Sequence, residues 1–161
     1  PTNIFKGIVQ QNETFDITLC NPPFHASLND ALAGTQRKLK NLAESQAKNF
    51  AQSRVTNKTL DKSSVLNFGG QGAELYCDGG EEAFVIRMIN ESALIKNQCF
   101  WFTSLISKAT TLPAVYRALK KVNALQVKTI DMAQGQKKSR LVAWTFLNVD
   151  QQRNWLKINR I

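Results

Sequence analysis

The sequence predicts an α/β fold with a mostly parallel sheet that ends in an antiparallel hairpin. Two apolar, β-prone runs, at residues 15–20 and 99–106, are separated by segments with helical spacing. Two more strand-like runs follow close together near the end of the chain. Strands that alternate with helices are typical of parallel sheets with helical crossovers, and strands joined by a short polar turn are typical of a hairpin.

The first half of the chain supplies one strand and two helical segments. Residues 15–20 are nearly all apolar or β-prone, which predicts a strand that is buried on both faces. Helical spacing follows over 28–33 and 36–47. The polar stretch at 52–67 is typical of a loop.

The middle of the chain predicts a helix, a strand and a second helix. Asp78-Gly-Gly-Glu81 has the spacing of a capping box and predicts a helix that reaches about Ile95. The run CFWFTSLI at 99–106 predicts another strand that is buried on both faces. Thr111 is a candidate N-cap for the helix that follows.

The end of the chain predicts the hairpin and a short helix. The segments ALQVKTIDM and RLVAWTFL are strand-like, and the polar turn AQGQKKS joins them. Residues 150–161 form a basic tail that contains Trp155 and fits a short helix. The 161 residues together are the size of a single domain.

The charge and the cysteine usage restrict the function class. The formal net charge of +9 favours a polyanionic partner, and nucleic acid fits better than a membrane, although a merely solvated surface is the alternative. No apolar run approaches the ~20 residues of a membrane span. Three cysteines without C-x-x-C spacing and a single histidine argue against a disulfide framework, a metal site and a catalytic triad. We therefore expect a cytoplasmic protein without a bound metal.

The excess positive charge is uneven along the chain, and two clusters are candidate contacts to nucleic acid. Lysine and arginine bind phosphates, so these clusters are expected to contact the backbone rather than the bases. The candidate RNA-binding residues are Arg37, Lys38, Lys40, Lys137, Lys138 and Arg140.

The segment Asn21-Pro22-Pro23-Phe24 is the candidate catalytic site. It follows a predicted strand directly, and ligands of open α/β sheets bind beyond the carboxyl ends of strands. The prolines fix two φ angles, so the segment offers a rigid carbonyl beside the Asn21 carboxamide and the Phe24 ring. These groups suit a planar aromatic amine, which would donate to both oxygens while the ring stacks. The alternative is that Asn-Pro only terminates the strand.

Asn21-Pro22-Pro23-Phe24 also resembles motif IV of the amino methyltransferases that depend on S-adenosylmethionine (SAM). Longer segments resemble the bacterial 23S ribosomal RNA adenine-N6 methyltransferase F family, and they are FDITLCNPPFHAS, NFGGQGAELYCDGGEEAFVIRMINES, WFTSL, LPAVYRALKKV and MAQGQKKSRLVAWTF. The resemblance implies a class I (Rossmann-like) methyltransferase fold, with SAM as cofactor and an adenine of 23S ribosomal RNA as substrate. Asn21 and the Pro22 carbonyl would hold the adenine amine, and the base would have to leave its stack to reach them.

One departure from the family concerns the cofactor. The family's glycine loop for SAM follows its first strand, well upstream of the motif, whereas only twenty residues precede Asn21 here. The resemblance therefore implies that residues 1–161 are the C-terminal half of a methyltransferase domain, with the cofactor-binding residues upstream of Pro1. Such a piece alone is expected to be inactive, and to self-associate through residues 15–20 or to retain its N-terminal half. A permuted glycine loop at 69–72 is the alternative, although the segments match the family in its ordinary order.

Other hypotheses remain at this stage. The motif also fits an amino methyltransferase acting on DNA or on a protein glutamine, and a noncatalytic RNA-binding fragment is the other alternative. A methyl-transferring role for Cys20 is disfavoured because the cysteine precedes Asn21 inside the strand. His25 is a substrate contact or an ordinary loop histidine, and Asp16 orients the loop or is solvated.

Overall fold

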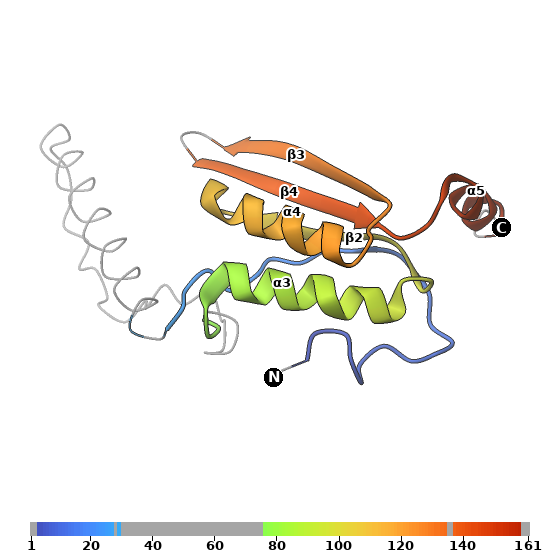
Figure 1. Cartoon of the computed structure of the whole chain (residues 1–161), viewed down its shortest axis with the longest axis horizontal. Helices are drawn as coiled ribbons and strands as arrows, with labels where there is room; N and C mark the ends of the chain where they lie inside the picture. The colour runs from blue at the N-terminus through green and yellow to red at the C-terminus, as the bar shows by residue number, and fades with distance from the viewer. Residues whose placement is uncertain (1–2, 28, 30–75, 135–136, 159–161) are drawn as a thin grey trace, which may run out of the picture.

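The computed structural model describes residues 3–27, 29, 76–134 and 137–158 (Figure 1). The predicted helices at 28–33 and 36–47, the loop at 52–67, the glycines at 69–72 and the first basic cluster lie outside these residues. The elements that it describes are β1 (Phe15–Thr18), α3 (Gly80–Ser92), a 3₁₀ turn η1 (Ala93–Ile95), β2 (Cys99–Ile106), a 3₁₀ turn η2 (Ala109–Thr111), α4 (Leu112–Lys121), β3 (Gln126–Gln134), β4 (Lys137–Thr145) and α5 (Val149–Ile158).

The four strands form one mixed sheet in the order β1-β2-β4-β3. β1 pairs with β2 in parallel, and β4 pairs with both β2 and β3 in antiparallel fashion. The predicted terminal hairpin is confirmed, whereas the described sheet is mixed and not mostly parallel. The reason is that β4 enters between β2 and β3, so that two of the three pairings are antiparallel.

The first strand is shorter and more exposed than its apolar sequence predicts. It ends at Thr18, and the prediction of burial on both faces over 15–20 is wrong for the described chain. Ile17 is 52% exposed and Leu19 is 76% exposed. β1 lies at the edge of the described sheet with β2 as its neighbour, so one side of the strand has no partner there.

The hydrophobic core lies between the sheet and the helices α3 and α4, which cover one face of it (Figure 1). β2 is buried along most of its length, as predicted, because β1 and β4 flank it. Phe102 and Trp144 are completely buried, and their rings stack with centroids 5.8 Å apart. The Trp144 indole N–H donates to the Ser92 hydroxyl at 3.0 Å, which joins the sheet to α3.

The end of the chain forms a short helix, α5, as predicted. The Trp155 ring stacks on Phe100 with centroids 6.0 Å apart, and its indole N–H donates to Asp16 Oδ1 at 2.7 Å. The Asp16 carboxylate therefore holds α5 against the amino end of the sheet, and it does not orient the segment that follows β1.

The segment that precedes β1 is fixed by one carboxylate of α3. Glu91 Oε2 accepts hydrogen bonds from three successive backbone N–H groups, those of Ile4, Phe5 and Lys6, at 2.8, 2.7 and 3.1 Å. Partial burial opposes ionisation of this group, but the three N–H groups and the Arg87 charge outweigh it and lower the pKa of Glu91 below its ordinary value. Phe5 is thereby held against the core, where its ring lies edge-on to Phe102.

Candidate active site at the carboxyl edge of the sheet

The parallel pairing of β1 and β2 brings the ends of the two strands to one edge of the sheet. Thr18 is opposite Phe102, and beyond the strand the Leu105 N–H still donates to the Cys20 carbonyl at 2.9 Å. Asn21 therefore lies beside the end of β2, at the kind of edge where α/β proteins bind their ligands.

The predicted catalytic residues form one segment that runs from solvent into the protein. Asn21 is exposed, and its carboxamide makes no hydrogen bond to another described residue. Pro22 and Pro23 are buried, and Phe24 is half-buried. Because the prolines are packed and their φ angles are fixed, the segment presents the free carboxamide from a rigid backbone.

The residues after Phe24 are joined to the segment that leads into α3. His25 forms an isolated parallel bridge with Tyr76, and its carbonyl accepts from the Cys77 N–H at 3.0 Å. His25 as a residue is half-buried. This pairing gives the backbone of His25 a structural role, and the substrate contact remains a hypothesis.

Two glycines stand at the start of α3, where the chain takes positive φ angles. Gly79 and Gly80 have φ angles of +78° and +65°, which L side chains rarely adopt. A Cβ atom at Gly79 would lie 2.5 Å from Ala83 Cβ, and one at Gly80 would meet the backbone of Ala26 at 3.5 Å. The predicted capping box is therefore wrong: the N-cap is Gly79, and no side chain caps the helix.

Glu81 in the first turn of α3 is a functional candidate that sequence reasoning missed. It is only 2% exposed. Its Oε2 atom accepts from the N–H of Ser107 at 2.8 Å and from the Ser107 hydroxyl, and Oε1 accepts from the N–H of Lys108 at 3.2 Å. The sequence predicted only a capping-box position at the start of the helix for this residue. No local pattern reveals a contact that spans 26 residues.

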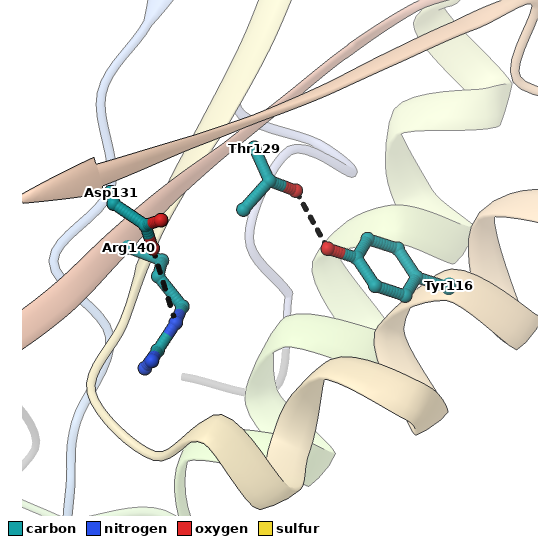
Figure 2. Close-up of polar contacts among 4 residues, drawn as sticks. All are labelled: Tyr116, Thr129, Asp131 and Arg140. Atoms are coloured by element: carbon teal, nitrogen blue, oxygen red, sulfur yellow. Dashed lines mark hydrogen bonds and ion pairs between the residues drawn. The ribbon is translucent and has the colours of Figure 1, made fainter.

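The second basic cluster lies on a strand and not in the predicted turn. β3 reaches Gln134 and β4 begins at Lys137, so the connection between them is shorter than the segment AQGQKKS. Lys138 is exposed. Figure 2 shows that Arg140 Nε pairs with Asp131 Oδ1, at 3.4 Å, near a hydrogen bond of 2.7 Å between the Tyr116 and Thr129 hydroxyls. Part of the Arg140 charge is therefore balanced, while the Lys138 charge is free in the described ranges.

Cys20 and Cys99 are not activated nucleophiles. Desolvation raises the pKa of the Cys20 thiol, although a hydrogen bond with Ser104 works against it, and it raises the pKa of Cys99 to about 12. A thiol with a raised pKa carries little thiolate at neutral pH, which argues against methyl transfer through Cys20. Among the residues that are placed, no cluster of histidine, cysteine or acidic side chains could hold a metal, and no helix is long and apolar enough to cross a membrane.

Comparison with known proteins gives one family and a set of close relatives. A family model described as RNA methyltransferase matches residues 1–148. The chain is 58% identical over 154 residues to the ribosomal RNA large subunit methyltransferase F of Methylobacillus flagellatus, covering 94% of this chain and 46% of that protein. It is 54% identical over 155 residues to the protein of the same name from Photobacterium profundum, covering 95% of this chain and 46% of that protein. The chain thus spans about half the length of the curated relatives that it matches.

Solved structures show the same fold at lower sequence identity. The catalytic domain of human METTL16 in complex with a MAT2A 3′UTR hairpin has a TM-score of 0.60 at 23% identity, over 87% of this chain and 42% of that domain. The N-terminal domain of human METTL16 in complex with SAH has a TM-score of 0.52 at 18% identity, over 90% of this chain and 38% of that domain. These similarities show that the chain shares the fold of part of those domains.

Proposed function

The chain belongs to the RNA methyltransferase family whose model it matches, and from this premise we propose that it holds the target base during methylation of the N6 amine of an adenine in 23S ribosomal RNA. The proposal concerns a protein of the relatives' full length that contains this chain, called the full-length protein below. The relatives that support the RNA substrate are named ribosomal RNA large subunit methyltransferase F. The single observation that carries the proposal is the exposed carboxamide of Asn21, which makes no hydrogen bond within the described part of the chain, beside two buried prolines.

In the proposed mechanism, two oxygens hold the reacting amine. The adenine NH₂ group donates one hydrogen to Asn21 Oδ1 and the other to the Pro22 carbonyl. With both hydrogens held, the nitrogen lone pair, which is ordinarily delocalised into the ring, is localised on the nitrogen toward one face of the base. Phe24 stacks on the ring and limits its rotation, a contact worth ~1–3 kcal/mol per base. Catalysis by this segment is orientation together with fixed dipoles, and it needs no strong base.

SAM is the proposed methyl donor, and when bound it would supply a methyl group on a cationic sulfur. The described residues do not contain the cradle that this cofactor needs. Gly79 is the N-cap of α3 and Gly80 is its first residue, and neither follows a described strand, so they do not form a glycine loop at a strand end. We therefore assign no cofactor-binding residue in this chain.

The proposed place of the chain in the full-length protein is the C-terminal half of a class I methyltransferase domain. In that arrangement the free edge of β1 pairs with a further parallel strand, and the complete sheet is mostly parallel. Helices that connect such a strand would cover the face of the sheet at this edge, where Ile17 in β1 and Leu19 just after it are exposed in the described structure.

The proposed RNA surface consists of the two basic clusters. The exposed Lys138 is its best-described member, and Arg140 contributes less because Asp131 pairs with it. The cations around Arg37 and Lys40 belong to the same proposal, although they lie outside the described residues.

The test is the identity of the methylated product. Unmodified 23S ribosomal RNA, duplex DNA and a glutamine-containing peptide are each incubated with the full-length protein and SAM that carries a labelled methyl group. The proposal predicts label in N6-methyladenosine after digestion of the RNA, and none in the other two substrates. Label in DNA or in glutamine, or in another nucleoside of the RNA, would contradict it.

A further inference from the structure

Two segments meet at the carboxyl edge of the sheet, and the proposed mechanism uses only one of them. Asn21–Phe24 follows β1, and Ser107 with Lys108 follows β2. Because Leu105 donates to the Cys20 carbonyl at 2.9 Å, the two segments leave the sheet side by side. The second segment, Ser107–Lys108, therefore lies next to the candidate amine-binding group and is called the wall below.

The wall is held by the buried carboxylate of Glu81. A carboxylate is costly to bury unless its oxygens are hydrogen-bonded. Here three donors, two of them the successive N–H groups of Ser107 and Lys108, satisfy both oxygens. No lysine or arginine among the placed residues pairs with this carboxylate, so its interactions are directed at the wall.

The same helix turn also contacts the other segment. Gly80, next to Glu81, donates its N–H to the Cys77 carbonyl at 2.7 Å, and the Cys77 N–H donates to the carbonyl of His25, the residue after Phe24, at 3.0 Å. One turn of α3 thus sets the positions of both segments relative to each other. A change at Glu81 would move the wall and leave the segment after β1 attached to the helix.

The wall ends in a free cation. Lys108 is exposed, and no carboxylate in the described ranges pairs with its ammonium group. A base that has left its stack carries its flanking phosphates to the rim of the pocket that receives it. A lysine at this rim is therefore within reach of a phosphate that moves with the target adenine.

We propose that Glu81 is a positioning residue that fixes the Ser107–Lys108 wall beside Asn21, and that Lys108 binds an RNA phosphate next to the target adenine. The inference rests on the proposed function for the identity of the base, while the phosphate contact is measurable by RNA binding alone. Glutamine cannot replace Glu81 fully, because its NH₂ group would face one of the N–H donors that the carboxylate accepts.

The experiment uses four single variants and one double variant of the full-length protein. Lys108→Gln removes the proposed phosphate contact, and Glu81→Gln releases the wall. Glu82→Gln is the matched control, because Glu82 is the next residue in the same turn and is exposed. Ser107→Ala removes only the hydroxyl contact to Glu81, and it serves as the milder variant if Glu81→Gln fails to fold.

The readouts are the unfolding temperature, the salt dependence of RNA binding, and kcat and KM for RNA. Lys108→Gln is expected to raise KM by about 3-fold to 10-fold with kcat within 2-fold of wild type. It is also expected to reduce the salt slope, which is the slope of the logarithm of the RNA-binding constant against the logarithm of the salt concentration, by about 1. Glu81→Gln is expected to raise KM similarly, Ser107→Ala to raise it less, and Glu82→Gln to match wild type. The KM of the double variant Glu81→Gln, Lys108→Gln should be no higher than that of the more affected single variant, since both changes remove the same phosphate contact.

Three results would overturn the inference. If Lys108→Gln bound RNA with the wild-type salt slope, Lys108 would not contact a phosphate. A loss of unfolding temperature in Glu81→Gln or Ser107→Ala with an unchanged KM would make Glu81 a purely structural residue. Additive effects in the double variant would show that the two residues act separately. If wild type methylated no RNA, the proposed function would fail, and the binding measurements would still decide the phosphate contact.

Discussion

Replacing Asn21 by alanine separates the chemistry of the candidate site from the stability of the fold. The side chain is exposed and makes no hydrogen bond to a described residue. Surface changes of this kind alter the free energy of unfolding by no more than about 0.5 kcal/mol. In the proposed mechanism, however, the same side chain accepts a hydrogen bond from an amine that becomes positively charged as it reacts.

The size of the expected rate loss follows from similar fixed dipoles. Removing one group that stabilises developing charge costs about 100-fold to 1000-fold in kcat, or about 2.7–4 kcal/mol. Asn21→Ala in the full-length protein is therefore expected to be nearly inactive while it unfolds at the wild-type temperature. The prolines support this expectation, because they are buried and keep the backbone of the segment in place when the carboxamide is removed.

The assay is single-turnover methylation of an RNA that contains the target adenine, together with thermal unfolding. Asn90→Ala is the control, since Asn90 is an exposed asparagine on α3 without a hydrogen bond from its side chain to the placed residues. That variant should keep wild-type activity. A rate for Asn21→Ala within 3-fold of wild type would refute the role that we assign to the carboxamide.

Three further changes test other parts of the molecule. Glu91→Gln should lower the free energy of unfolding by about 1 kcal/mol at neutral pH, because it weakens three backbone hydrogen bonds. Since the pKa of Glu91 is lowered from 4.5 in the folded state, its contribution is present above that pH and is lost as the pH falls through the folded value. The free energies of unfolding of wild type and Glu91→Gln, measured with urea, should therefore converge in strong acid. A difference that stays constant with pH would contradict the assignment. Charge reversal in the basic clusters, with Lys138→Glu as the described case, should weaken binding to RNA of any sequence and flatten its salt dependence, whereas an unchanged slope would mean ordinary surface charge. This chain by itself should self-associate through the exposed edge of β1 or retain an N-terminal partner, and should bind SAM poorly; a stable monomer with micromolar SAM affinity in light scattering and calorimetry would contradict this.

The elements that were predicted correctly are those whose signal is local. CFWFTSLI is buried because β2 has a strand on each side and helices over one face, as its continuous apolar run indicates. The position of Asn21 near the end of a strand followed from the apolar run before it and the two prolines after it. Both signals depend on adjacent residues.

The predictions that failed depend on features that lie far apart or on backbone angles. The apolar run at 15–20 predicts a buried strand, but it does not show which neighbouring elements bury it. In the described sheet this strand has one neighbouring strand, β2. The capping-box spacing at Asp78 does not reveal that Gly79 and Gly80 adopt positive φ angles. Glu81 could not be recognised as the anchor of Ser107, because the two residues are joined by the fold and not by a pattern.

The most direct test of the central claim is a structure of the full-length protein bound to its RNA substrate. The claim is that Asn21 and Pro22 hold the amine of the target adenine. We expect the N6 atom to lie at about 2.9 Å from Asn21 Oδ1 and from the Pro22 carbonyl oxygen, with the base stacked on Phe24. A target adenine held by other residues, with Asn21 still facing solvent, would contradict the claim.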